Sequence, residues 1–179
     1  MNVPNILTAI RFVLIPIFAY YLISGNYYTA VFLFLLGGLT DILDGFIARK
    51  FNLITSWGKL ADPLADKLMQ ITALVILTIV KRVISPELLA IVIAKEIFMG
   101  IGSILLYKQK KYVVSANWYG KMATVVFYFA IIMIIFRAPY SSVYIWIAVI
   151  ATLFAFIMYV RTFHSIKSSV DKERNPQPH

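Results

Sequence analysis

Long apolar runs with hardly a polar residue constrain this chain more than any other feature of its sequence. Residues 123–136, for example, present apolar side chains on every face. The strands of an outer-membrane barrel would instead alternate apolar and polar residues. The run therefore predicts an α-helix in a bilayer, not a strand.

Six segments of this kind follow one another along the chain. A helix needs about 20 residues to cross a hydrocarbon core of about 30 Å. Six such helices account for most of the 61% of hydrophobic residues among the 179. Turn-forming and charged residues separate the segments. The expected spans are residues 6–24, 28–48, 60–80, 87–107, 119–136 and 141–163.

The expected fold class is therefore all-α, a polytopic integral membrane bundle of six transmembrane helices with an N-terminal interfacial helical segment. Residues 1–167 form one six-helix domain in this prediction, and the polar residues 168–179 form a disordered cytoplasmic tail. The apolar content argues against a soluble enzyme. The absence of cysteine argues against a disulfide-stapled module or a zinc finger. No basic segment precedes the first apolar run, so we expect that run to remain in the membrane and not to be cleaved.

The net charge of +9 is explained by membrane orientation, and no nucleic-acid partner is expected. The loops on one side of the predicted bundle contain only Lys81, Arg82 and Arg137. The loops and tail on the other side contain Arg49, Lys50, Lys59, Lys108, Lys110, Lys111, Arg161, Lys167, Lys172 and Arg174. Because basic residues accumulate on the cytoplasmic side, both termini are predicted to be cytoplasmic.

A polar stripe begins the first apolar segment. Asn5, Thr8 and Arg11 recur at three-residue spacing, which places them on one face of a helix that starts near Pro4. Two interpretations stay open. The stripe can lie among lipid headgroups with Arg11 snorkelling towards water, or it can bind phosphate.

Four of the eight acidic residues, Asp41, Asp44, Asp62 and Asp66, fall within a stretch of 26 residues. Aspartate near the bilayer centre costs about 2.5–3.5 kcal/mol on insertion scales, so such a cluster calls for cations. Each pair shares a helix face, because its members are three or four residues apart. A short loop joins the two helices, so they should run antiparallel and bring the carboxylates together near the cytoplasmic surface.

The chemistry of these donors indicates Mg²⁺ or Mn²⁺ rather than zinc or copper, since all four are hard carboxylates and the chain lacks cysteine. Two such ions can clamp a phosphoryl group during in-line attack. The small residues Gly45, Ala48 and Gly58 share the faces of the aspartates and leave room for a flat nucleotide or a neighbouring helix. The alternative is that the aspartates are solvated helix ends paired with nearby basic residues.

The complete set of positions resembles the signature of the CDP-alcohol phosphotransferases, in the form Asp41-x2-Asp44-Gly45-x2-Ala48-Arg49-x8-Gly58-x3-Asp62-x3-Asp66. Residues 2–11 and 60–67 resemble the branch that contains phosphatidylglycerophosphate synthases and cardiolipin synthases. The resemblance implies a bacterial cell-membrane enzyme with a cytoplasmic active site. Its expected reaction is transfer of a phosphatidyl group from CDP-diacylglycerol to glycerol 3-phosphate, with release of CMP. The expected partners are these substrates, membrane lipids and a second copy of the chain in a homodimer.

The resemblance also assigns roles to individual residues. Asp41, Asp44 and Asp62 become metal ligands, and Asp66 becomes the general base and a contact of the second ion. The nucleotide site becomes Asp41, Gly45, Ala48, Arg49 and Gly58. A base is chemically necessary, because an alcohol is a poor nucleophile at neutral pH until a carboxylate takes its proton.

The acceptor phosphate needs a basic pocket, for which the available cations are Arg11, Lys95 and Lys121. Lys95-Glu96 stands where phosphatidylglycerophosphate synthases resemble one another in an Arg-Glu pair. Lys121 lies in a segment that resembles their Gly-Lys-x-Lys-Thr element, with Ala123 in place of the second lysine. Alternatively, Glu96 neutralises Lys95 and Lys121 snorkels.

Three other functions remain open at this point. The acceptor can be phosphatidylglycerol, as in a cardiolipin synthase, or another polyol. The aspartates can form the ion site of a cation transporter. The chain can also be a catalytically silent lipid-binding homologue.

Overall fold

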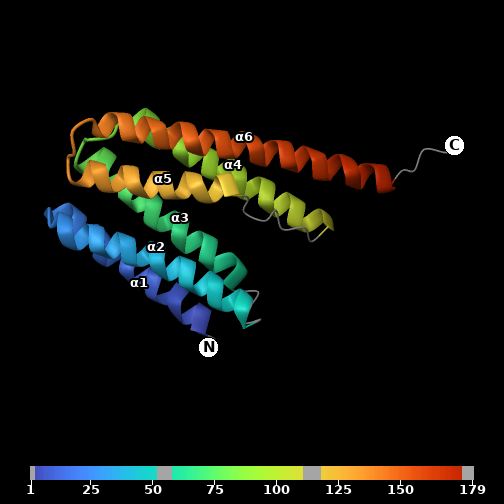
Figure 1. Cartoon of the computed structure of the whole chain (residues 1–179), viewed down its shortest axis with the longest axis horizontal. Helices are drawn as coiled ribbons and strands as arrows, with labels where there is room; N and C mark the ends of the chain where they lie inside the picture. Colours follow the sequence, from blue (N-terminus) through green and yellow to red (C-terminus); the bar gives the residue numbers. More distant parts are fainter. Residues whose placement is uncertain (1–2, 52–57, 111–117, 175–179) are drawn as a thin grey trace. The chain divides into compact units, whose positions relative to one another are not determined.

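The computed structural model describes residues 3–51, 58–110 and 118–174, and within these ranges it is all-helical, without a β-strand (Figure 1). A π-helical turn, η1, directly continues the third α-helix. The elements are α1 (Val3–Ser24), α2 (Tyr27–Lys50), α3 (Gly58–Val75), η1 (Ile76–Val80), α4 (Pro86–Lys110), α5 (Trp118–Ile135) and α6 (Ser141–Arg174). The expected all-α class is confirmed.

Four helices of the described chain are long and apolar enough to cross a membrane, which makes the protein an integral membrane protein. Large apolar side chains on these helices are exposed, as expected for surfaces that face lipid; Phe32 and Ile150 are each 64% exposed. The four segments are Pro4–Ser24, Tyr27–Ala48, Trp118–Ile135 and Ser141–Thr162. Helix α3 differs from them because its sequence contains two lysines and two aspartates.

The N-terminal polar stripe is part of a continuous helix. Helix α1 runs from Val3 to Ser24, so the expected interfacial segment is the first part of a candidate span. Arg11 is only 2% exposed. The interpretation of Arg11 as a side chain that snorkels towards the headgroups is therefore wrong, because the side chain is enclosed by protein.

The helices divide into two compact units, which are described separately. The first contains the described residues up to 89 together with 131–138. In it, α1 packs against α2, α3 and η1, and α2 also packs against α3. The fully buried rings of Phe18 and Phe34 stack with their centroids 5.5 Å apart. This packing determines which faces of α1, α2 and α3 meet, and therefore which of their polar residues lie near one another.

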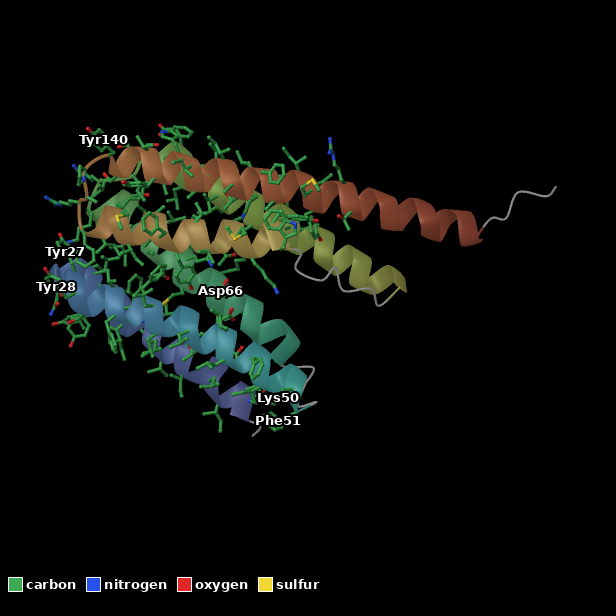
Figure 2. All side chains as sticks on the ribbon, in the orientation of Figure 1. Tyr27, Tyr28, Lys50, Phe51, Asp66 and Tyr140 are labelled. Atoms are coloured by element: carbon green, nitrogen blue, oxygen red, sulfur yellow. The ribbon has the colours of Figure 1, made fainter. Side chains whose placement is uncertain are left out.

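A tight turn joins α1 to α2, at the break that the sequence predicts. Gly25 adopts a φ of +85°, a conformation that favours glycine. The Asn26 side chain accepts a hydrogen bond from the Thr29 amide at 3.3 Å and so caps α2. Tyr27 and Tyr28 lie at this end of α2, and Lys50 and Phe51 lie at the other (Figure 2). Helices α1 and α2 therefore form an antiparallel hairpin.

The span expected at 60–80 is divided between α3 and η1. The amide of Lys81 donates to the carbonyl of Ile76 at 2.9 Å, the spacing of a π-helix. The Lys81 ammonium donates to the carbonyl of Ile23 at 3.0 Å. This contact ties the end of α1 to the end of η1.

The second unit contains the described residues 90–130 and those from 139 onward. Phe129 of α5 and Tyr144 of α6 pack edge to face with ring centroids 5.8 Å apart. Helix α6 continues to Arg174 and so extends into the polar segment that was expected to form the tail. An established helix gains one hydrogen bond for each added residue, and no proline interrupts it before Pro176. The rest of the expected tail lies outside the described residues.

Candidate active site

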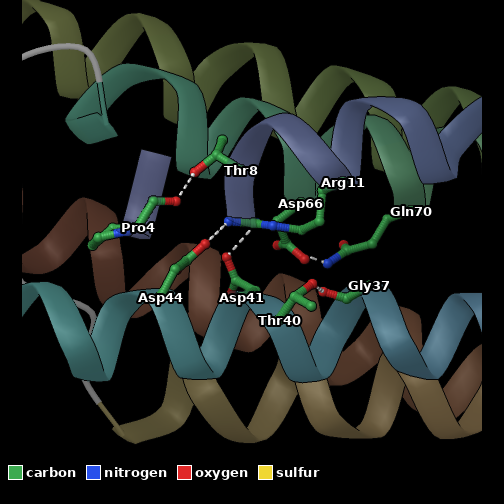
Figure 3. Close-up of polar contacts among 9 residues, drawn as sticks. All are labelled: Pro4, Thr8, Arg11, Gly37, Thr40, Asp41, Asp44, Asp66 and Gln70. Atoms are coloured by element: carbon green, nitrogen blue, oxygen red, sulfur yellow. Dashed lines mark hydrogen bonds and ion pairs between the residues drawn. The ribbon is translucent and has the colours of Figure 1, made fainter. Parts of the chain in front are cut away.

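One arginine of α1 joins two aspartates of α2 (Figure 3). Arg11 Nη1 donates to Asp41 Oδ1 at 2.6 Å, and Arg11 Nη2 donates to Asp44 Oδ2. We call these three residues the arginine–aspartate cluster. It lies in the half of the hairpin away from the Gly25 turn, about two turns inside the start of α1 and the end of α2.

Local helix geometry builds this cluster. Asp41 and Asp44 are three residues apart and therefore share the face of α2 that packs against α1. On α1, Thr8 lies one turn before Arg11, is fully buried and donates to the carbonyl of Pro4 at 3.1 Å. Thr8 and Arg11 of the stripe thus face protein, and Asp41 and Asp44 share one face of α2, as their spacing predicts.

Burial makes the charge balance of the cluster important. The side chain of Asp44 is 1% exposed and that of Asp41 is 37% exposed, so the cluster is buried on the Asp44 side and accessible on the Asp41 side. A buried charge is tolerated only when an opposite charge and hydrogen bonds compensate for its lost hydration. The planar guanidinium supplies both to the two carboxylates. With one cation and two anions, the cluster keeps a net negative charge.

Asp66 contributes a further carboxylate to the first unit. It lies on α3, which packs against both α1 and α2, and its side chain is half-buried. Its Oδ2 accepts a hydrogen bond from Gln70 Nε2 at 3.0 Å. Figure 3 draws this pair in the same view as the arginine–aspartate cluster. The sequence prediction missed Gln70, although its position four residues after Asp66 was a signal of contact.

The remaining signature positions are described by where they lie along α2 and α3. Gly45 and Ala48 are half-buried on α2 beyond Asp44. Gly58 is the first residue of α3, and Asp62 follows one turn later. The side chains of Arg49 and Asp62 lie outside the described part of the structure. Among the side chains described, no three His, Cys, Asp or Glu residues gather as a metal-binding group. The predicted four-carboxylate metal site therefore stays a prediction.

The lysines predicted to bind the acceptor phosphate belong to the second unit. Lys95 is 9% exposed, and its Nζ lies 2.5 Å from Glu96 Oε1. This ion pair is the neutralisation that the sequence offered as an alternative. Lys121 is exposed, and Thr124, one turn further along α5, donates to the carbonyl of Gly120 at 3.1 Å. The acceptor site built from these lysines stays a prediction.

A membrane-embedded helical chain with aspartates at this spacing defines a class of lipid enzyme. Residues 1–154 match the family model of CDP-alcohol phosphatidyltransferase, and the chain belongs to this family. The family resemblance stated from the sequence is thereby confirmed.

Relatives from three bacteria carry the same name, CDP-diacylglycerol–glycerol-3-phosphate 3-phosphatidyltransferase. The protein of Aquifex aeolicus is 38% identical over 125 residues, which cover 69% of this chain and 70% of that protein. The protein of Bacillus subtilis is 33% identical over 175 residues, covering 85% of this chain and 90% of that protein. The protein of Escherichia coli is 30% identical over 171 residues, covering 89% of this chain and 93% of that protein.

Proposed function

We propose that this protein transfers a phosphatidyl group from CDP-diacylglycerol to glycerol 3-phosphate, producing phosphatidylglycerophosphate and CMP for phospholipid biosynthesis. The observation that carries the proposal is the similarity to relatives named for this reaction, which extends over 85% of the chain in the Bacillus subtilis protein. The arginine–aspartate cluster supports it, because two signature aspartates converge as the reaction needs.

Divalent cations fit the donor chemistry of the proposed site. Asp41, Asp44, Asp62 and Asp66 would hold Mg²⁺ or Mn²⁺, two ions in our proposal, through hard carboxylate oxygens. The region around Asp44 already stabilises positive charge, since a buried guanidinium bonds that carboxylate. When bound, the ions supply stabilisation of the negative charge that develops on the CMP leaving group.

The side chains of the protein position the reactants and move one proton. Asp66 takes the proton from the acceptor hydroxyl as that oxygen bonds to phosphorus and the bond from phosphorus to the CMP oxygen breaks. Gln70 orients the Asp66 carboxylate through its 3.0 Å hydrogen bond. In our proposal Asp41, Gly45, Ala48, Arg49 and Gly58 bind the cytidine nucleotide. Direct transfer of this kind uses no covalent enzyme intermediate.

The acceptor phosphate is proposed to bind Lys95 and Lys121. Arg11, the third cation expected there, has both terminal nitrogens on carboxylates and is explained better as part of the arginine–aspartate cluster. Lys95 is nearly buried, so its contact with a phosphate would be strong once Glu96 is displaced or shared.

The proposed membrane arrangement has six spans. The two beyond the four apolar helices are α3 with η1, and α4. In this proposal both termini and the active site lie on the cytoplasmic side of a bacterial cell membrane, the orientation that the distribution of basic loop residues favours. One substrate carries two acyl chains and the other is water-soluble, so the site should open sideways to the cytoplasmic leaflet. A homodimer is proposed from the family resemblance.

Product identification tests the proposed function. The purified protein is incubated with CDP-diacylglycerol and equal amounts of glycerol 3-phosphate and phosphatidylglycerol, with Mg²⁺ or with excess EDTA. Mass spectrometry should find phosphatidylglycerophosphate and CMP, and only with the metal. Cardiolipin as the main product would instead support the other acceptor. Cation flux into liposomes without any nucleotide would support a transporter and refute the enzyme.

A further inference from the structure

We propose that Arg11 is a positioning residue, which fixes the carboxylates of Asp41 and Asp44 relative to each other and so sets them in place to bind a divalent cation. The inference rests on the proposed function. It goes further, because it assigns to α1 the task of shaping a metal site whose ligands lie on other helices.

The geometry gives Arg11 two separate bonds to the ligands. Its Nη1 lies 2.6 Å from Asp41 Oδ1, and its Nη2 bonds Asp44 Oδ2. Both nitrogens belong to one rigid plane, so the guanidinium sets the two carboxylates relative to each other as well as to α1. Partners that orient metal ligands in this way typically contribute about 10–100-fold to metal affinity.

Burial keeps this arrangement in place. Arg11 is 2% and Asp44 1% exposed, so water does not compete readily for the bond between them. Separating the two would leave a buried charge without its counter-ion, which is strongly unfavourable. The fit between α1 and α2 thus holds the guanidinium against the carboxylates.

The charge of Arg11 and its geometry act on metal binding in opposite directions. A positive charge near the site repels a divalent cation and weakens its binding. Fixed carboxylates bind the cation more tightly, because less conformational freedom is lost on binding. A lysine at position 11 keeps the charge but replaces the planar fork by a single point charge. The Arg11→Lys variant therefore separates the two contributions.

Titration of the full-length protein with Mn²⁺, followed by electron paramagnetic resonance of the unbound ion, measures the effect. We expect Arg11→Lys to weaken Mn²⁺ affinity by about 10-fold and Arg11→Gln by up to about 100-fold. The matched control is Lys50→Gln, which removes a positive charge from the exposed end of α2 and should change affinity by less than about twofold.

Two results of the titration would overturn the inference. Wild-type affinity in Arg11→Lys, or tighter Mn²⁺ binding in Arg11→Gln, would show that Arg11 acts through its charge alone. If neither variant folds, the Mn²⁺-bound structure of the wild-type protein decides the question. Arg11 should remain within about 3 Å of both carboxylates, and a displaced side chain would refute the proposal. Failure of the proposed function is seen separately, in the product assay, because Mn²⁺ binding does not depend on the acceptor.

Discussion

Gly37 on α2 controls how closely α2 approaches α3 beside the candidate site. A Cβ atom at this position would lie 2.8 Å from the terminal methyl group of Met69, where ordinary contacts begin at 3.4 Å. Gly37 lies one turn before Asp41, and Met69 lies three residues after Asp66. A larger residue at position 37 should therefore push apart the two helices that carry the aspartates.

The free-energy cost of a substitution at Gly37 depends on how far the Met69 side chain can move away from the added atoms. Gly37→Ala should cost little, because the end of a methionine is flexible and alanine favours a helix by about 1 kcal/mol over glycine. Gly37→Val adds two further methyl groups, which movement of one methyl group does not accommodate. Overpacking of this kind costs about 1–3 kcal/mol. A displacement of the aspartates by about 1 Å would lower turnover by up to about 100-fold.

Reversible unfolding in mixed micelles, with CMP release measured on the same samples, tests this reasoning. Met69→Ala should rescue Gly37→Val, since it removes the methyl group with which valine collides, and the coupling free energy should be about 0.5–3 kcal/mol. Wild-type stability and turnover in Gly37→Val would refute the close approach. So would a double variant whose losses are simply additive.

Three further substitutions test the candidate site. Asp66→Asn should lower CMP release by at least about 100-fold while thermal unfolding stays close to wild type, and full activity would exclude Asp66 as the base. Gln70→Leu should lower kcat by about 10-fold with little change in KM, since it removes a group that orients Asp66, and an effect on KM alone would contradict that role. Asp44→Asn should cost about 3–5 kcal/mol of unfolding free energy because it breaks the buried ion pair between Arg11 and Asp44. Asp41→Asn, at a more exposed site, should cost less than about 1 kcal/mol, and equal losses in the two variants would contradict the burial of the cluster.

The apolar runs predicted the helices well, because a membrane span must pair all its backbone groups internally and be about 20 residues long. Four of the expected spans coincide with helices that are long and apolar enough to cross a membrane. The π-helical turn at the end of α3 was not predicted, because a single extra residue per turn leaves no periodic signal. The extension of α6 was missed because polarity alone does not stop a helix.

The candidate site was predicted only as far as spacing determines it. Spacing placed Asp41 and Asp44 on one face, and the structure shows them joined through Arg11. It did not reveal what Arg11 faces, because a helix that is apolar on most sides does not indicate which side meets protein and which meets lipid. Gln70 was overlooked because one polar residue in an apolar span has several explanations.

The arginine–aspartate cluster between α1 and α2 also affects how the chain enters the membrane during synthesis. An aspartate or arginine inserted alone into the hydrocarbon region costs up to about 2.5–3.5 kcal/mol, the value at the bilayer centre. Arg11 precedes Asp41 and Asp44 in the chain, so it leaves the ribosome before them. The short turn at Gly25 and Asn26 then brings it within reach of both aspartates as they emerge. The first two helices can then partition into lipid as one mostly neutralised hairpin, and a ribosome-bound fragment ending after α2 should insert less efficiently when Arg11 is replaced.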